Sequence, residues 1–315
     1  MLDTLQILTQ RIKAKTIELG FDLCGIAPVR DSVFKEQFRE WLELGFAGDM
    51  SYMERDPERR LNPRLVMPSV RSIVAVAKNY YTEIPANFPA DNARFARYAL
   101  NEDYHDVMKK TLQELLRFIE ENSDHEVTGK IYVDSGHLLE REIARLAGIG
   151  WFGKNTMIIN TRKGSWFLLG ELLLDIDLPP DEPALGGCGT CTRCIDACPT
   201  SAIVRPYVVD SRKCISYLTI ENREEIPPPL AEKMGNRVFG CDICQEVCPF
   251  NIRRARPTQY PAFQPRPHIH NHKLTELAEI GDEEFRSLFK KSPVKRTKRS
   301  GLARNCAAAI SARKS

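Results

Sequence analysis

The residues most able to do chemistry in this 315-residue chain are cysteines, and eight of the ten lie between residues 188 and 248. The first run, CGTCTRCIDACPT, has the C-x2-C-x2-C-x3-C-P spacing of bacterial ferredoxins and contains Cys188, Cys191, Cys194 and Cys198. Zinc is the alternative, but it usually takes four ligands from two separated pairs and does not explain the C-x3-C-P ending. The spacing therefore predicts iron–sulfur clusters and electron transfer.

The second run, CDICQEVCPF, is one cysteine short and contains Cys241, Cys244 and Cys248. Two 4Fe–4S clusters need eight thiolates, and Cys214 in RKCISYL supplies the eighth. In two-cluster ferredoxins the last cysteine of a run ligates the other cluster. We therefore expect one ligand set of Cys188, Cys191, Cys194 and Cys248, and a second of Cys198, Cys214, Cys241 and Cys244.

The two remaining cysteines, Cys24 and Cys306, are expected to be small apolar packing residues. Hydrophobic residues make up 43% of the chain and charged residues 28%, as in ordinary soluble globular proteins. No apolar run reaches the roughly 18 residues that a membrane span requires. The N-terminus has no signal-peptide pattern, so we expect a cytoplasmic protein that does not bind membranes.

Positive charge gathers at the C-terminal end of the chain. Residues 290–315 hold nine Lys or Arg residues and no acid, although the net charge of the whole chain is only +3. Such a segment is either a solvated end or a surface for a polyanion such as nucleic acid.

Hydrophobic periodicity predicts a mixed α/β or α+β fold for the N-terminal half. We expect helices over 1–22, 103–122 and 137–150, and strands over 71–81, 130–134, 157–160 and 165–175. The Pro- and Gly-rich segment 177–187 is a predicted boundary. The expected organisation is a catalytic domain at 1–180, a cluster domain at 181–260 and a basic helical segment at 261–315.

Clusters only move electrons, so residues 1–180 must hold whatever accepts them. This region contains no G-x-G-x-x-G and no G-x4-G-K-[ST] phosphate loop. DYHDVM contains the D-x-H start of some cobalamin-binding loops, in Asp103 and His105, but lacks the glycine of that pattern. Asp103 is predicted to be a helix N-cap, and His105 is not assigned as a cobalt ligand.

Seven motifs, in order, carry a resemblance over roughly residues 1–305: RRLNPRLVMPSVRSIV (59–74), DYHD (103–106), VDSGHLLERE (133–142), AGIGWFGKNTMII (147–159), the first cysteine run, CISYLT (214–219) and GNRVFGCDICQEVCP (235–249). Together they resemble the epoxyqueuosine reductases. The resemblance implies a nitroreductase-like cobalamin-binding domain fused to a bacterial ferredoxin-like domain with two 4Fe–4S clusters. Many members continue into HEAT-like helical repeats, and this sequence ends at Ser315, one helix into that region.

The resemblance also implies a reaction. Base-off cobalamin, reduced by the two clusters, would convert epoxyqueuosine to queuosine at the wobble position of a tRNA with a GUN anticodon. The expected partners are that tRNA and an unidentified low-potential electron donor, and we expect a monomer. Asp134 matches the proton donor of the family, which would protonate the alkoxide that develops as the epoxide opens. The alternative role for Asp134 is a helix N-cap; as the acid, it is expected to be buried at the strand end against the corrin.

The cofactor contacts that the resemblance implies, besides Asp134, come from both domains: Arg60, Ala96, Arg97, Lys154, Asn155, Thr156, Met157, Ile158, Ser165, Leu169, Ser216, Tyr217 and Asp242. Ile158 and Leu169 could equally be strand core, and Arg60 and Arg97 surface ion-pair residues. The segments 290–304 and 251–256 are expected to contact tRNA phosphates, with Lys295, Arg296, Lys298 and Arg299 as the assigned residues. The rival functions are a reductive dehalogenase acting on a small molecule, and a plain electron carrier.

Overall fold

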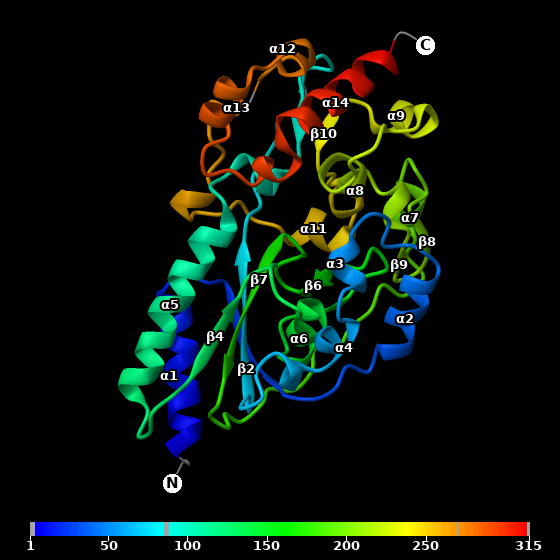
Figure 1. The fold of residues 1–315 in the computed structure, drawn as a ribbon. Helices are drawn as coiled ribbons and strands as arrows, with labels where there is room; N and C mark the ends of the chain where they lie inside the picture. Colours follow the sequence, from blue (N-terminus) through cyan, green and yellow to red (C-terminus); the bar gives the residue numbers. More distant parts are fainter. Residues whose placement is uncertain (1–3, 85–87, 270, 314–315) are drawn as a thin grey trace.

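The computed structural model describes residues 4–84, 88–269 and 271–313, and a four-stranded antiparallel sheet lies at the centre of its N-terminal half (Figure 1). The strand order is β1–β2–β7–β4, with all three pairings antiparallel. The bounds are β1 Leu23–Pro28, β2 Ser72–Asn79, β4 Gly129–Tyr132 and β7 Phe167–Leu174. The β-branched run of β2 is buried from Ser72 to Lys78, as expected for a central strand.

Helices cover both faces of this sheet. α1 (Thr4–Glu18) and α5 (Tyr104–Asn122) lie along one face, where Val74 and Val76 pack with Leu112 and Leu115 (Figure 1). α6 (Glu140–Leu146) packs on the other face against Ile73, Ala75 and Ala77. The two sets of β2 side chains alternate because successive residues of a strand point to opposite faces.

Three short helices between β1 and β2 join the sheet to the cysteine-rich module: α2 (Lys35–Glu43), α3 (Ser51–Glu54) and α4 (Pro57–Leu61). Trp41 Nε1 donates to the Val209 carbonyl at 2.7 Å, and the Asp49 amide donates to Tyr217 Oη at 2.7 Å. The hairpin of β5 (Trp151–Phe152) and β6 (Ile158–Ile159) lies on the α6 side of the sheet.

The cysteine-rich module is built from short elements between long loops: α7 (Arg193–Asp196), β8 (Ile203–Arg205), β9 (Val208–Val209), α8 (Ile215–Ile220), α9 (Pro228–Met234), β10 (Arg237–Phe239), α10 (Ile243–Glu246) and α11 (Pro249–Arg254). α7 and α10 each start within a cysteine run and contact one another. This pairing brings the two runs together.

The C-terminal segment shares a core with earlier parts of the chain. α12 (Leu274–Ala278), α13 (Asp282–Leu288) and α14 (Lys298–Ser311) surround β10 and the short strand β3 (Arg94–Phe95), which pairs in parallel with β10. Phe95, Phe239, Phe289 and Cys306 are buried in this core. Residues 261–269 and 271–313 are therefore packed onto both halves of the molecule instead of forming a core of their own.

Most expected elements are present, and the fold is α+β because its main sheet is entirely antiparallel. The helix expected over 137–150 begins only at Glu140, and the strand expected over 130–134 ends at Tyr132. The helical stretch over 273–289 is two helices, separated around Gly281. Among the described helices, none combines the length and apolar character that crossing a bilayer needs.

Candidate redox site

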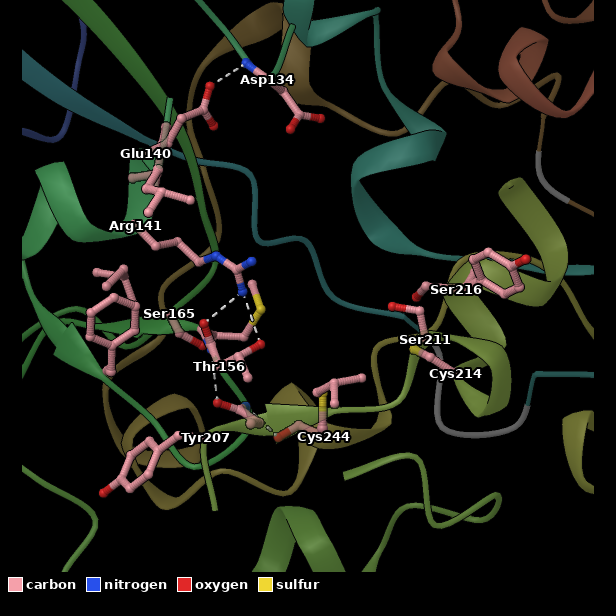
Figure 2. A pocket seen from close by; sticks show the side chains of 18 of the residues that line it. Asp134, Glu140, Arg141, Thr156, Ser165, Tyr207, Ser211, Cys214, Ser216 and Cys244 are labelled. Carbon is pink, nitrogen blue, oxygen red and sulfur yellow. Dashed lines mark hydrogen bonds between the residues drawn. The ribbon is translucent and has the colours of Figure 1, made fainter. Parts of the chain in front are cut away.

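A cavity of 1980 Å³ lies between the N-terminal half and the cysteine-rich module. Its wall includes α2, α3, the loop 134–140, the β5–β6 hairpin and residues of α8 and α10. Figure 2 shows Asp134, Glu140 and Arg141 on one side of this pocket, with Ser211, Cys214 and Ser216 on the other. The volume exceeds the roughly 300–1,000 Å³ of pockets for drug-sized ligands, so the site can hold a large cofactor together with part of a substrate.

One group of clustered cysteines gathers around Cys194. Burial raises the pKa of the Cys194 thiol, and three neighbouring thiols raise it further: Cys188, Cys248 and Cys191. The sulfur of Cys188 also accepts a hydrogen bond from the Lys154 amide at 3.4 Å. The first three cysteines of the first run therefore lie beside the last cysteine of the second run.

The other group gathers around Cys214. Burial raises the pKa of Cys244, with Cys241 and Cys214 adding to the shift, and Cys198 acts in the same way on Cys214. All four cysteines of this group, Cys214 included, line the cavity. The four cysteines of the other group, Cys194 included, are not among its lining residues. Cys194 also contributes to the shift at Cys244, so the two groups lie near one another, and only the Cys214 group faces the cavity. The two ligand sets stay a prediction.

A buried ion pair fixes the second cysteine run against the N-terminal half. Arg97 Nη1 lies 3.1 Å from Asp242 Oδ2 and 2.7 Å from Glu246 Oε1, and the Arg97 side chain is 8% exposed. Asp242 Oδ2 also accepts the Arg97 amide at 2.9 Å. The guanidinium stacks over the ring of Trp166, 4.8 Å from its centroid. Because Asp242 follows Cys241 directly, these contacts set the position of the cysteines beside the cavity.

Asp134 lies on the open wall of the cavity, two residues after β4. Its backbone is in the left-handed region, with φ of 51°. This conformation costs about 1–3 kcal/mol and persists only where neighbouring groups hold it in place. It does not cap α6, because Leu139 occupies that position. The expectation of burial is wrong: the side chain is 63% exposed, since the strand ends at Tyr132 and the following loop carries Asp134 away from the sheet.

Two aromatic residues at the start of α5 face the Asp134 carboxylate. Tyr104 Oη donates to Asp134 Oδ2 at 2.5 Å, and burial raises the pKa of this phenol well above its usual value, so it remains a donor. His105 Nε2 lies 3.9 Å from the same oxygen, and its ring stacks on Tyr104. Asp103 caps α5 by accepting the His105 amide, as predicted, and its Oδ1 also lies 2.7 Å from His105 Nδ1.

Two carboxyl groups lie behind the loop, and one of them holds the Asp134 backbone. Glu140 Oε1 accepts the Asp134 amide at 2.6 Å. Glu171, on β7, is fully buried, and as a carboxylate it has no donor among the described residues, but the Glu140 carboxyl lies within hydrogen-bond reach. A proton on one of the pair gives both a partner. Burial, and then the negative charge of Asp134, raises the pKa of Glu140 to about 8.

Most of the expected cofactor residues line the cavity together with Asp134: Arg60, Asn155, Thr156, Met157, Ile158, Ser165, Leu169, Ser216, Tyr217 and Asp242. Three others lie elsewhere. Ala96 is buried and its amide pairs with the Phe239 carbonyl, and Arg97 is occupied by the interdomain ion pair. Lys154 Nζ donates to the Gly189 carbonyl at 2.8 Å, beside the first cysteine run.

Of the four expected tRNA-binding residues, only Arg296 is a cavity-lining residue. It pairs with Glu221 at 3.0 Å, and Arg299 pairs with Asp282 at 3.1 Å. Lys295 and Lys298 are exposed. The two arginines are thus partly engaged within the protein, whereas the two lysines face solvent.

Sequence reasoning missed the polar residues around Asp134. The predicted motifs and strands include Tyr104, Glu140 and Glu171. The fold brings two of them, Tyr104 and Glu171, to the Asp134 loop from 30 or more residues away. Glu140 could have been suspected, because it is an acid inside VDSGHLLERE beside a predicted catalytic acid. No local signal marked Glu171, which looks like one polar residue in an apolar strand.

Two family models match the chain. One, described as "Epoxyqueuosine reductase QueG, DUF1730", matches residues 60–135, and the other, described as "4Fe-4S double cluster binding domain", matches residues 187–251. An epoxyqueuosine reductase of Cellulophaga algicola is 43% identical over 298 residues, which cover 93% of this chain and 95% of that protein. The second model places the iron–sulfur clusters in the segment that holds both cysteine runs.

Two solved structures are similar over almost the whole chain. One is an epoxyqueuosine reductase bound to an epoxyqueuosine-modified tRNA-Tyr stem loop; it is 32% identical, with a TM-score of 0.90 over 97% of this chain and 81% of that chain. The other is the Bacillus subtilis epoxyqueuosine reductase with its catalytic aspartate loop swung out of the active site. It is 31% identical, with a TM-score of 0.90 over 97% and 82% of the two chains.

The carboxyl pair behind Asp134 predicts a pH dependence of stability. Glu140 keeps its proton up to about pH 8 in the folded protein but loses it near its ordinary pKa of 4.5 when unfolded. Between these values the folded state binds more protons, so stability falls as pH rises. In Glu140→Gln the neutral amide replaces the protonated acid. We expect its thermal unfolding midpoint to fall less between about pH 5 and pH 8 than that of the wild type.

Glu120→Gln, an exposed substitution on α5, is the matched control and should follow the wild-type curve. Glu171 titrates in the same direction, so part of the pH dependence should survive in Glu140→Gln. A Glu140→Gln curve that parallels the wild type throughout this range would contradict the shared proton.

Proposed function

Because the chain belongs to the epoxyqueuosine reductase family, we propose that it reduces the epoxide of epoxyqueuosine in tRNA to the alkene of queuosine. The observation that carries this proposal is the shared cavity. The four cysteines of the Cys214 group, Cys214 included, line the same cavity as Asp134. Electrons and a proton can therefore reach one substrate from opposite walls. The relatives that match over most of the chain are epoxyqueuosine reductases, which disfavours a dehalogenase or a plain electron carrier.

The two cysteine groups are proposed as the ligand sets of two 4Fe–4S clusters, one of Cys188, Cys191, Cys194 and Cys248, the other of Cys198, Cys214, Cys241 and Cys244. The thiols within each group lie near enough to raise one another's pKa, beyond the effect of burial. Among the described residues, no three metal-binding side chains are close enough to hold a single metal ion. The thiols of each group are therefore spread more widely than the ligands of one ion. Electrons would pass from the outer set to the cavity-facing set.

The cavity also suits cobalamin. Its volume is 1980 Å³, and three buried N–H donors on its wall have no partner among the described residues: Arg60 Nε, Arg145 Nε and Trp151 Nε1. Corrin amides require such donors, together with small polar side chains such as Ser165, Thr156 and Ser216. Bound cobalamin would supply a low-valent cobalt centre that delivers two electrons to the epoxide. The residues would hold the corrin between the sheet and α8.

Asp134 is proposed as the acid that protonates the epoxide oxygen. Tyr104 and Glu140 hold its carboxylate and its amide in a left-handed backbone conformation that needs such support. The exposed carboxylate faces the cavity, where a substrate would cover it and exclude water. In the Bacillus subtilis relative a catalytic loop that carries an aspartate is swung out of the active site, which supports a catalytic role for the 134–140 loop.

The reaction is tested with protein reconstituted with iron, sulfide and cobalamin, a low-potential reductant, and an anticodon stem loop that carries epoxyqueuosine. Wild-type protein should yield a stem loop with one oxygen atom fewer, as measured by mass spectrometry. Asp134→Ala should retain iron and cobalamin but turn over roughly 100- to 10,000-fold more slowly, because a positioned acid contributes about that much. A stem loop whose mass is unchanged after incubation with the wild type would contradict the proposed reaction. Wild-type turnover by Asp134→Ala would contradict the role of Asp134.

The tRNA would reach the cavity over the basic C-terminal segment. Arg296 stands at the cavity wall and stacks over Tyr52, 5.7 Å from the ring centroid. Lys295 and Lys298 lie nearby in sequence and are exposed.

A tRNA substrate would place the enzyme in the cytoplasm, and its electrons would come from a low-potential donor protein. We propose that it acts as a monomer.

Phosphate binding by the two lysines predicts a change in salt dependence. Replacing Lys295 and Lys298 with Gln should weaken stem-loop binding and lower the slope of log K against log salt by about 0.7 to 0.9 for each phosphate that is no longer neutralised. Cobalamin uptake should be unchanged. The matched control replaces Lys109 and Lys110 on α5, outside the basic C-terminal segment. A slope equal to that of the control would remove these lysines from the tRNA interface.

A further inference from the structure

The proposed reaction needs two protons, and Asp134 can hold only one. Converting an epoxide to an alkene with loss of the oxygen as water consumes two electrons and two protons. One proton goes to the oxygen as the ring opens, and the second completes water as the C–O bond breaks. The two electrons come from the low-potential donor through the clusters. A second source of protons must therefore reach Asp134 or the substrate once the bound substrate covers the Asp134 carboxylate.

His105 is placed to be that source. Its Nε2 lies 3.9 Å from Asp134 Oδ2, and both residues line the cavity. This gap can be closed by rotation of the exposed carboxylate or by one bridging water. The ring is 32% exposed, so it can also exchange protons with solvent.

Asp103 holds the imidazole in the orientation that this role requires. Asp103 Oδ1 lies 2.7 Å from His105 Nδ1 and also caps α5 through the His105 amide at 3.1 Å. The contact keeps a proton on Nδ1, which leaves Nε2 as the nitrogen that gains and loses a proton toward Asp134. Stacking on Tyr104, with ring centroids 4.0 Å apart, fixes the plane of the ring.

The other neighbours of Asp134 are arranged differently. Tyr104 donates to Asp134 Oδ2, but burial raises the pKa of its phenol, so it keeps its proton. Glu140 contacts the Asp134 amide, and Figure 2 shows the Asp134 carboxylate pointing away from it. These two residues position the acid: the Tyr104 phenol keeps its proton, and the Glu140 carboxyl contacts the Asp134 amide and Glu171, not the Asp134 carboxylate.

Resting on the proposed function, we propose that His105, oriented by Asp103, supplies the second proton of the reaction by re-protonating Asp134. After Asp134 gives its proton to the epoxide oxygen, the N–H bond of the imidazolium Nε2 breaks and an O–H bond forms on the Asp134 carboxylate. Asp134 then delivers this proton to the departing oxygen, which leaves as water. The neutral imidazole regains its proton from solvent at its exposed edge.

The test is chemical rescue in the stem-loop assay with excess reductant. His105→Ala should lower the turnover rate by at least about 10-fold, and added imidazole should restore a large part of it because the ring can occupy the space left behind. His105→Gln preserves the size and polarity of the side chain but not the proton transfer, so it should stay slow with or without imidazole. Asp103→Asn should lower the rate less than His105→Ala, since it removes the orienting charge only.

A structural role for His105 predicts the reverse pattern, in which Gln restores the rate and imidazole has no effect; that result would overturn the proposal. Wild-type turnover by His105→Ala would also overturn it while leaving the proposed reaction intact. Failure of the wild type to convert the stem loop would instead refute the proposed function. His125→Ala, at an exposed position beyond the far end of α5, is the matched control, and iron and cobalamin contents verify that each variant is assembled.

Discussion

The buried ion pair between Arg97 and Asp242 is the interaction on which the rest of the site depends. It joins the N-terminal half to the second cysteine run across 145 residues of sequence, in a position where the Arg97 side chain is 8% exposed. Removing one partner of such a pair costs about 3–5 kcal/mol, because the other charge is left buried. Since Asp242 lies between two cysteines that line the cavity, in the proposed reaction this contact would set where electrons enter the site.

The opposite wall is organised around a proton. Asp134 holds a left-handed backbone conformation that a non-glycine residue rarely adopts, and Tyr104 and Glu140 bind it from two sides. The Glu140 carboxyl can lie beside buried Glu171 only if the pair shares a proton, which keeps negative charge low behind the loop. The carboxylate that faces the cavity is therefore presented by a support that carries little competing charge of its own.

Local patterns in the sequence predicted what local physics determines. The apolar spacing of α5, the β-branched run of β2 and the N-cap at Asp103 are short-range features, and the structure confirms them. Counting ligands predicts that Cys214 completes the second run, because cluster stoichiometry limits the choices. The structure places Cys214 near Cys244 and Cys198, and the ligand assignment stays a prediction. The start of α6 and the exposure of Asp134 could not be predicted, since they depend on where β4 leaves the sheet. The sequence allowed a surface ion pair for Arg97, but no pattern indicated that this pair is buried or that Lys154 contacts the first cysteine run.

In the proposed reaction, the cluster held partly by Cys214 delivers electrons to the cavity that contains Asp134. The most direct measurement is iron content and EPR of Cys214→Ala, together with the rate at which its bound cobalamin is reduced. Cys24→Ser serves as the control, because Cys24 packs against the sheet core away from both cysteine groups. We expect Cys214→Ala to keep the outer cluster and bind cobalamin, but to lose the cavity-facing cluster and no longer reduce the cofactor. Two intact clusters, or cobalamin reduction at the wild-type rate, would contradict it.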